Sequence, residues 1–230
     1  MERRNRALRT DLGKKVLCFA HEVPGKGEAL LSDGEKYPAY ILDEPGKCVL
    51  RGVLEYTGGV ELILADPSKP ADQADLAVAV GADKIKGKKR LTCSTELSCG
   101  AVVYEEEENE RRYLVVRAQK GHVGFPKGHR EAYETTHQTA LREVAEETGL
   151  LVEIIPGFEE ESFYPAEQTI SKRVICYLAK KSGGELRLQA AEIAAGGFYP
   201  YEKAMRLLTY ARDREILTAA ESFLAENKAK

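Results

Sequence analysis

The sequence contains no tryptophan, no long apolar run and no excess of charge of one sign. Its apolar runs, such as residues 76–80, are too short to cross a bilayer as a helix, so we expect no membrane partner. The charged first residues lead into no apolar stretch, and we expect no secretory signal. The formal net charge of −3 lacks the broad basic field that draws proteins to nucleic acid.

Cysteine is also sparse, and its pattern excludes several classes of site. The chain has 5 cysteines, an odd number, with neither CxxC pairs nor the density of a disulfide scaffold. Reduced, mostly buried thiols are typical of a cytoplasmic protein, and that is the location we expect. The cysteines are Cys18, Cys48, Cys93, Cys99 and Cys176.

The first part of the chain has the pattern of a small β-rich domain. Its length of 230 residues allows one large domain or two small ones, and the basic stretch at residues 84–90 is the best candidate for a junction. We therefore predict an N-terminal domain at residues 1–92, in which we recognise no family. It is a candidate for dimerisation, ligand binding or shielding of an active site. Gly- and Pro-containing turns separate its expected strands, at residues 15–21, 39–43, 48–56 and 60–65, and a short helix is expected within residues 68–80.

The second part alternates strands and helices. The order favours an α/β sandwich with helices on both faces of a mixed sheet, at residues 96–227. An exposed acidic connection is expected at residues 105–110 and a loop at residues 121–128. Strands are expected at residues 101–104, 113–117, 151–155 and 173–179, and helices at residues 135–148 and 202–225.

Three carboxylates gather on the helix expected at residues 135–148. At about 100° per residue, Glu143, Glu146 and Glu147 lie on one side, opposite Leu141 and Val144. A solvated acidic face is the ordinary explanation of such a cluster. The alternative is a hard divalent cation, and carboxylate oxygens suit Mg²⁺ or Mn²⁺ better than zinc.

The spacing around this cluster favours the cation. Residues 128–150 read Gly, five residues, Glu, seven residues, then Arg-Glu-Val-x-Glu-Glu-x-Gly-Leu. This segment matches every fixed position of the Nudix box, and residues 96–227 resemble the Nudix hydrolase superfamily. The resemblance implies the α/β/α Nudix sandwich and metal-assisted cleavage of a phosphoanhydride bond.

The resemblance also implies roles for individual residues. Glu143, Glu146 and Glu147 would bind the metals, joined by the carbonyl of Lys127, and Arg142 would orient a glutamate. The base that activates water would be Glu143, Glu147 or a glutamate outside the box. Glu192 matches such a late glutamate, and an ordinary exposed carboxylate is its alternative. Glu134 fits a structural role as well as metal binding.

The residues that lead into the box resemble one subgroup, the asymmetrical diadenosine tetraphosphate hydrolases. The Pro126-Lys127-Gly128-His129 passage is similar to that subgroup, and Lys127 and His129 would contact phosphate. Tyr164 and Lys172 match its adenine-stacking tyrosine and phosphate-contacting lysine. Core packing is the alternative for Tyr164.

Two departures weaken the substrate assignment. Tyr133 stands where the subgroup has glycine, and a tyrosine limits access to positive φ. The subgroup's tryptophan ahead of the Pro-Lys turn is missing. We expect hydrolysis of dinucleoside polyphosphates such as diadenosine tetraphosphate to AMP and ATP. The alternatives are an RNA 5′-pyrophosphohydrolase, a nucleoside or inositol polyphosphate hydrolase, and, in another class, a nucleotide-sensing regulatory module. A homo-oligomer is compatible with each of them.

Overall fold

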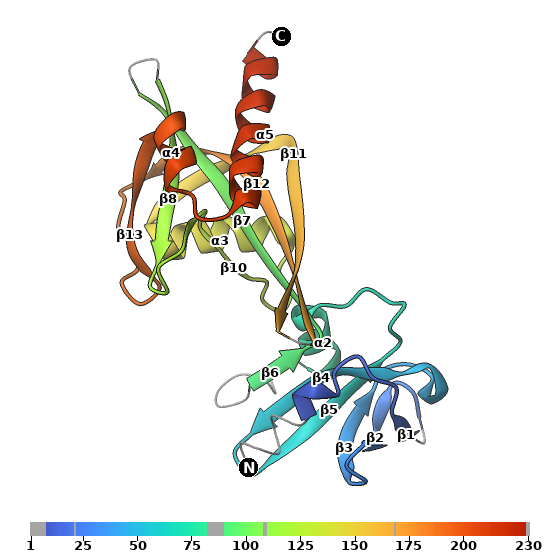
Figure 1. Ribbon diagram of the computed structural model, residues 1–230. Coiled ribbons are helices and arrows are strands. Elements are labelled where there is room, and N and C mark those ends of the chain that lie inside the picture. Colours follow the sequence, from blue (N-terminus) through green and yellow to red (C-terminus); the bar gives the residue numbers. More distant parts are fainter. Residues whose placement is uncertain (1–7, 21, 82–89, 108–109, 168, 229–230) are drawn as a thin grey trace. The chain divides into compact units, whose positions relative to one another are not determined.

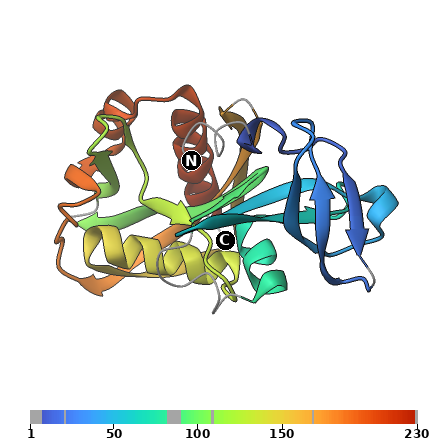
Figure 2. The same ribbon diagram turned by 90° about the horizontal axis from the view of Figure 1, so that it is seen from below.

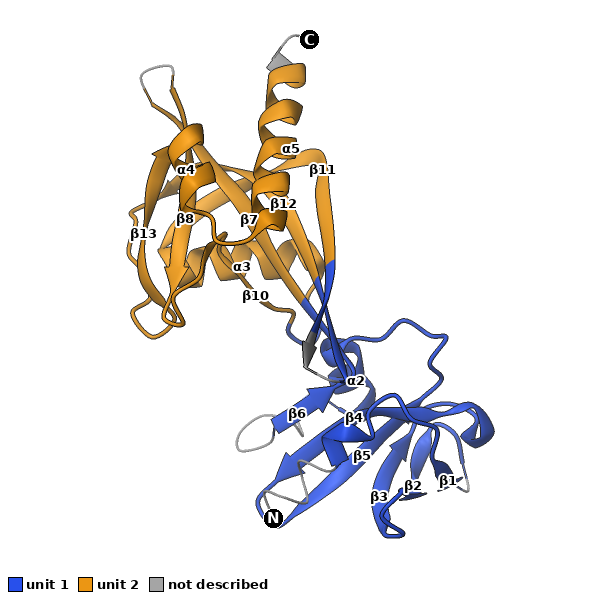
Figure 3. Cartoon of the chain, viewed as in Figure 1, with its two compact units in different colours: residues 1–97, 131–133, 163–173 blue, residues 98–130, 134–162, 174–230 orange. Residues whose placement is uncertain are grey.

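The chain is divided into two compact units, shown in different colours in Figure 3. The computed structural model describes residues 8–20, 22–81, 90–107, 110–167 and 169–228. Unit 1 comprises residues 1–97, 131–133 and 163–173, and unit 2 comprises residues 98–130, 134–162 and 174–230. Functional boundaries at residues 1–92 and 96–227 stay a prediction. The expected junction at residues 84–90 lies outside the described residues, except for Arg90.

Unit 1 is built on a mixed sheet with the order β1-β2-β3-β5-β4-β6, in which β3 and β5 run parallel. The sequence pattern finds four of these strands and misses β2 and β6, because Pro24-Gly25 reads as a turn where β2 begins and Arg90 ends a basic stretch. The strands are β1 (Leu17–Ala20), β2 (Gly25–Leu30), β3 (Lys36–Ile41), β4 (Val49–Tyr56), β5 (Gly59–Ala65) and β6 (Arg90–Cys93), and a 3-10 turn, η1 (Pro45–Lys47), precedes β4.

Local chemistry explains two features of this unit. Tyr56 pairs with Gly59, so a two-residue turn joins β4 to β5, and Gly58 has the φ of +97° that favours glycine there. The short helix α2 (Gln73–Val80) begins at a capping box made by Asp72. It packs on the sheet in a small hydrophobic core that includes Ile63 and Cys93.

The larger hydrophobic core of unit 1 lies elsewhere in the unit. It contains Leu8, Leu12, Ala29, Leu31, Tyr37, Ala39, Ile41, Cys48, Leu50, Val53, Leu62, Leu64 and Ile170.

Unit 2 is built on a second sheet with the order β11-β12-β7-β8-β13, to which β9 and β10 add short pairings. The strands are β7 (Thr95–Glu107), β8 (Glu110–Ala118), β9 (Val123–Gly124), β10 (Lys127–His129), β11 (Leu150–Glu167), β12 (Ile170–Gly184) and β13 (Ile193–Pro200). The helices are α3 (Thr136–Thr148), α4 (Tyr201–Leu207) and α5 (Ala211–Lys228).

The helices of unit 2 lie on opposite faces of its sheet. Figures 1 and 2 show α4 and α5 on one face and α3 on the other. The side of α4 and α5 that meets the sheet is apolar, and Leu208, Ile216 and Leu217 share a core with Val102 and Leu178. The predicted fold class, an α/β sandwich with a mixed sheet, is confirmed.

Three predicted elements differ from the structure. The loop expected at residues 121–128 contains the short strand β9 and the first residues of β10. The connection expected at residues 105–110 is strand wherever the structure describes it, since Glu105 pairs with Arg112 and Glu106 with Arg111, and residues 108 and 109 lie outside the described residues. Ion pairs between the strands and to Lys180 and Lys181 offset the acidic charge.

The single helix predicted at residues 202–225 is wrong. It is two helices, because the Thr209 backbone N–H donates to the Val123 carbonyl (3.0 Å) and its hydroxyl accepts from the Val123 N–H (2.8 Å). In the part of the chain that the structure describes, no helix has the length and apolarity needed to span a membrane.

Candidate active site

The helix α3 carries the acidic cluster, and short-range interactions set both of its ends. Thr135 accepts from the Gln138 N–H while the Gln138 side chain accepts from the Thr135 N–H, which is a capping box. At the other end Gly149 adopts φ of +73°, the left-handed conformation of a helix C-terminus. The predicted helix at residues 135–148 is thereby confirmed within one residue.

Two of the three carboxylates in the acidic cluster are buried, and the third, Glu146, is exposed. Glu143 is 8% exposed and Glu147 is 6% exposed, whereas Leu141, grouped by the sequence pattern with the apolar side, is 38% exposed. Burial raises the pKa of Glu147 to about 7, although Lys127 opposes the shift. Burial also raises the pKa of Glu143, against the opposing effect of Arg142. Removing two carboxylates from water is unfavourable unless something offsets their charge.

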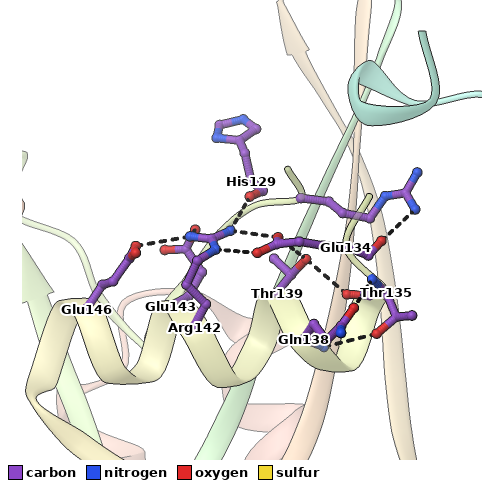
Figure 4. Close-up of polar contacts among 9 residues, drawn as sticks. His129, Glu134, Thr135, Gln138, Thr139, Arg142, Glu143 and Glu146 are labelled. Carbon is purple, nitrogen blue, oxygen red and sulfur yellow. Dashed lines mark hydrogen bonds and ion pairs between the residues drawn. The ribbon is translucent and has the colours of Figure 1, made fainter. Parts of the chain in front are cut away.

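Arg142 offsets part of that charge (Figure 4). Its guanidinium donates to both oxygens of Glu134 (2.6 and 3.0 Å), to Glu143 (2.7 Å) and to Glu146 (3.0 Å). These hydrogen bonds, the one to Glu134 foremost, raise the pKa of Arg142. It also donates to the His129 carbonyl (2.9 Å). Glu134 thus accepts hydrogen bonds from Arg142 and from the Thr139 hydroxyl (2.8 Å). This arrangement suits a structural role for Glu134.

The box glycine allows the strand β10 to lie directly on α3. A Cβ atom added at Gly128 would overlap the carboxylate of Glu143, and one added at Gly100 would overlap Pro126 and Lys127. β10 pairs with β7 here, with Gly128 opposite Cys99. Glycine at these positions therefore places the backbone of Lys127 against the carboxylates. The Lys127 N–H donates to Glu147 (3.2 Å).

Two further carboxylates, Glu192 and Asp213, interact electrostatically with residues of the site. Glu192 directly precedes β13 and is exposed, and its charge adds to the rise in the pKa of Glu143 and Glu147 that burial causes first. Asp213 lies in the first turn of α5, where burial raises its pKa and Lys127 lowers it. The sequence pattern misses Asp213, because it reads α4 and α5 as one helix and so hides a helix start that favours an acidic residue.

The residues predicted to bind substrate are divided between the two units. His129 is exposed at the end of β10. Tyr164 is 43% exposed and Lys172 is half-buried, and both belong to unit 1, whereas the carboxylates belong to unit 2. Their roles in the site stay predictions. Tyr133 adopts φ of +70°, so the left-handed turn that favours glycine is retained despite the tyrosine.

Of the three histidines other than His129, the structure describes two. His21 lies outside the described residues. His137 stacks on Tyr177 with ring centroids 4.3 Å apart, and His122 lies 6.1 Å from Tyr210 by the same measure.

The donor chemistry of the cluster fits a divalent cation. Glu143 and Glu147 are buried carboxylates, and the charge of Glu143 adds to the rise in the pKa of Glu147 that burial causes first. Oxygen ligands of this kind suit a hard metal. Among the described residues, however, no three acidic, histidine or cysteine side chains converge as a finished metal cage. Arg142 holds one carboxylate oxygen of Glu143 and one of Glu146 in its own hydrogen bonds.

Two known proteins with similar sequences illustrate the relationship. A protein of Mycobacterium tuberculosis named as a mutator protein, MutT4, is 30% identical over 148 residues, which is 60% of each chain, so the match spans less than two thirds of that relative. The asymmetrical bis(5′-nucleosyl)-tetraphosphatase of Mus musculus is 32% identical over 145 residues, 57% of this chain and 97% of the relative.

A solved structure and a family model agree with these relatives. The crystal structure of a C. elegans Ap4A hydrolase binary complex is similar with a TM-score of 0.53 and 27% identity, over 57% of this chain and 98% of that one. The model of the NUDIX domain matches residues 95–220, more than half of the chain, and includes the box and its carboxylates. The chain therefore belongs to the Nudix family.

Proposed function

We propose that this chain hydrolyses dinucleoside polyphosphates such as diadenosine tetraphosphate, giving AMP and ATP, with Mg²⁺ or Mn²⁺. The observation that carries the proposal is the pair of buried carboxylates, Glu143 and Glu147, packed against the backbone of Lys127. Buried acidic groups with raised pKa values are typical of catalytic sites. The names of the murine and nematode relatives support the substrate class.

The residues of the site divide the reaction between them. Glu143, Glu146 and Glu147, with the carbonyl of Lys127, would hold the cation, which when bound would offset the charge of the phosphates and lower the pKa of a water molecule. Arg142 orients the carboxylates through the hydrogen bonds described above. The ammonium group of Lys127 would stabilise negative charge on phosphate oxygens, and His129, which lies on the same strand, would contact phosphate.

The bond changes balance with water as the second reactant. The water oxygen attacks a phosphorus atom, the P–O–P bond breaks, and the leaving phosphate oxygen keeps the electron pair. Glu143, Glu147 or Glu192 accepts the proton of the water. Tyr164 stacks on a base and Lys172 contacts phosphate in this proposal.

Product analysis with a panel of substrates tests the proposal. With Mg²⁺ present, diadenosine tetraphosphate should yield AMP and ATP, and Glu147→Gln should abolish turnover while the chain stays folded. Glu185→Gln is the matched control, because Glu185 is exposed and pairs with Arg187 on the surface. Cleavage of triphosphorylated RNA, inositol polyphosphates or nucleoside triphosphates, with diadenosine tetraphosphate left intact, would refute the substrate. Nucleotide binding without any turnover would indicate a sensing module instead.

The proposal includes a cytoplasmic location. All five cysteines are free thiols in the structure, and Cys48, Cys93, Cys99 and Cys176 are buried. Unpaired buried thiols suit a reducing compartment. Fractionation of the cells that make the protein would test this, and recovery from an oxidising compartment would contradict it.

A further inference from the structure

The hairpin of β11 and β12 belongs to both units. Its base lies in the sheet of unit 2, whereas residues 163–173 belong to unit 1, and Figure 3 shows this change of colour along both strands. Tyr164 and Lys172 lie in this outer part of the hairpin. A hairpin that leaves its sheet has little core of its own, and an isolated pair of strands is marginally stable in water. Phe163 at its outer part is 69% exposed, with the guanidinium of Arg173 5.8 Å from the ring centroid.

Three contacts fix this outer part of the hairpin within unit 1. Ile170 is 6% exposed and is part of the unit 1 core that contains Leu8 and Leu62. The Thr169 hydroxyl donates to the Arg9 carbonyl (2.7 Å). The Ser171 N–H donates to the Ser94 carbonyl (3.0 Å). A side chain, a hydroxyl and a backbone N–H on consecutive residues thus all end on unit 1.

The groups that receive these contacts are themselves held. Arg9 donates twice to Glu55 on β4, at 2.8 and 3.2 Å. The Ser94 N–H donates to the Arg51 carbonyl of the same strand (2.9 Å). Both hydrogen bonds therefore lead from the hairpin to β4, a strand in the interior of the sheet.

We propose that unit 1 is a positioning module, which holds the β11–β12 hairpin in the conformation that presents Tyr164 and Lys172 to a nucleotide. This inference rests on the proposed function, because it takes those two residues to bind substrate. Thr169 and Ile170 are positioning residues that act through Tyr164 and Lys172. A loop ordered before binding loses less conformational entropy when the ligand arrives, so the anchor strengthens binding without taking part in the chemistry.

Two kinds of measurement on the full chain test the anchor. Hydrogen exchange should become faster at residues 163–173 in Ile170→Ala and Thr169→Val, while amides in α3 keep their protection. The KM for diadenosine tetraphosphate should rise roughly tenfold with kcat nearly unchanged, because only uniform binding of substrate is lost. Thr169→Ser keeps the hydroxyl donor and should restore the KM.

Further variants separate positioning from general loss of stability. Leu62→Ala makes a cavity in the same core without altering the hairpin, and it should leave the KM unchanged at temperatures where unit 1 stays folded. Combined with Tyr164→Ala, the Ile170→Ala change should add little to the KM, because both changes remove the same contact with substrate.

The anchor and the proposed function fail in different ways. Unchanged hydrogen exchange at residues 163–173, or faster exchange with an unchanged KM, would overturn the anchor. ADP-ribose and GTP are assayed in parallel with diadenosine tetraphosphate. If the unaltered chain cleaves ADP-ribose or GTP but not diadenosine tetraphosphate, the proposed substrate is wrong, and the KM for the compound that is cleaved tests the anchor in the same way. If the chain cleaves none of the three compounds, the proposed function fails, and the hydrogen-exchange result alone decides whether the hairpin is anchored.

Discussion

At the scale of the residue, the burial of Glu147 makes the stability of the protein depend on pH. Its carboxyl group has a pKa of about 7 in the folded chain, against an ordinary value of 4.5. The folded chain therefore holds a proton that the unfolded chain has released. This contribution to stability is complete below about pH 4.5 and is lost as the pH rises through about 7.

We expect the metal-free protein to lose up to about 3 kcal/mol of unfolding free energy between pH 4.5 and 8 through this one group. Glu147→Gln cannot titrate there, so its stability should fall less over the same interval. Urea unfolding at several pH values in the presence of a chelator measures the difference. Parallel pH profiles for the two proteins would show that Glu147 has an ordinary pKa in the folded state.

The backbone of Tyr133 gives a second prediction at this scale. A non-glycine residue in the left-handed region costs roughly 1–3 kcal/mol, and glycine in its place loses about 0.5–1 kcal/mol through greater freedom of the unfolded chain. Because Tyr133 has φ of +70° and is 74% exposed, Tyr133→Gly should stabilise the protein by up to about 1 kcal/mol. Tyr133→Ala keeps the strained conformation and should give no gain. Equal unfolding midpoints for the two variants would contradict this explanation.

At the scale of the element, the start of α3 depends on the hydroxyl of Thr135. Thr135→Ala removes the acceptor for the Gln138 N–H and should cost about 1 kcal/mol of unfolding free energy. Thr135→Ser retains the acceptor and should cost much less. Denaturant unfolding of both variants measures the cap. If Thr135→Ser lost as much unfolding free energy as Thr135→Ala, the loss would come from the methyl group of the threonine and not from its hydroxyl.

The contrast between α3 and α5 shows which elements can be predicted from sequence. Thr135 and Gly149 mark the ends of α3 within one residue, and the prediction of this helix is confirmed. The break at Thr209 depends on hydrogen bonds to Val123, 86 residues earlier in the chain. No local pattern contains that information, so one long helix is the natural but wrong interpretation.

The candidate site divides in the same way. The spacing of the box predicts that Glu143, Glu146 and Glu147 lie on one face of a helix. It does not predict that Glu143 and Glu147 are buried while Leu141 is exposed, because the packing of α3 against β10 through Gly128 decides which side faces inward. The roles of Tyr164 in stacking on a base and of Lys172 in contacting phosphate involve a bound substrate, and they stay predictions.

At the scale of the whole molecule, the chain has separate cores in its two units. Leu62 is fully buried in the core of unit 1, and Leu217 is fully buried in that of unit 2. Truncating a buried leucine to alanine costs about 2–5 kcal/mol. We expect Leu62→Ala to speed hydrogen exchange in β3, β4 and β5, and Leu217→Ala to speed it in α5 and β7, each leaving the other unit protected.

The two cores also predict an order of events for the Leu62→Ala variant. As urea rises, unit 1 should unfold first and release residues 163–173, while α3 and its carboxylates remain folded. Within that range the protein should still hydrolyse its substrate in the presence of Mg²⁺, but with a raised KM. Assays at increasing urea, with exchange of α3 amides as the control, measure this separation. A contrary result would be a kcat that falls as unit 1 unfolds, while the remaining activity keeps its KM. It would mean that the two units unfold together and that the catalytic carboxylates need unit 1 to be folded.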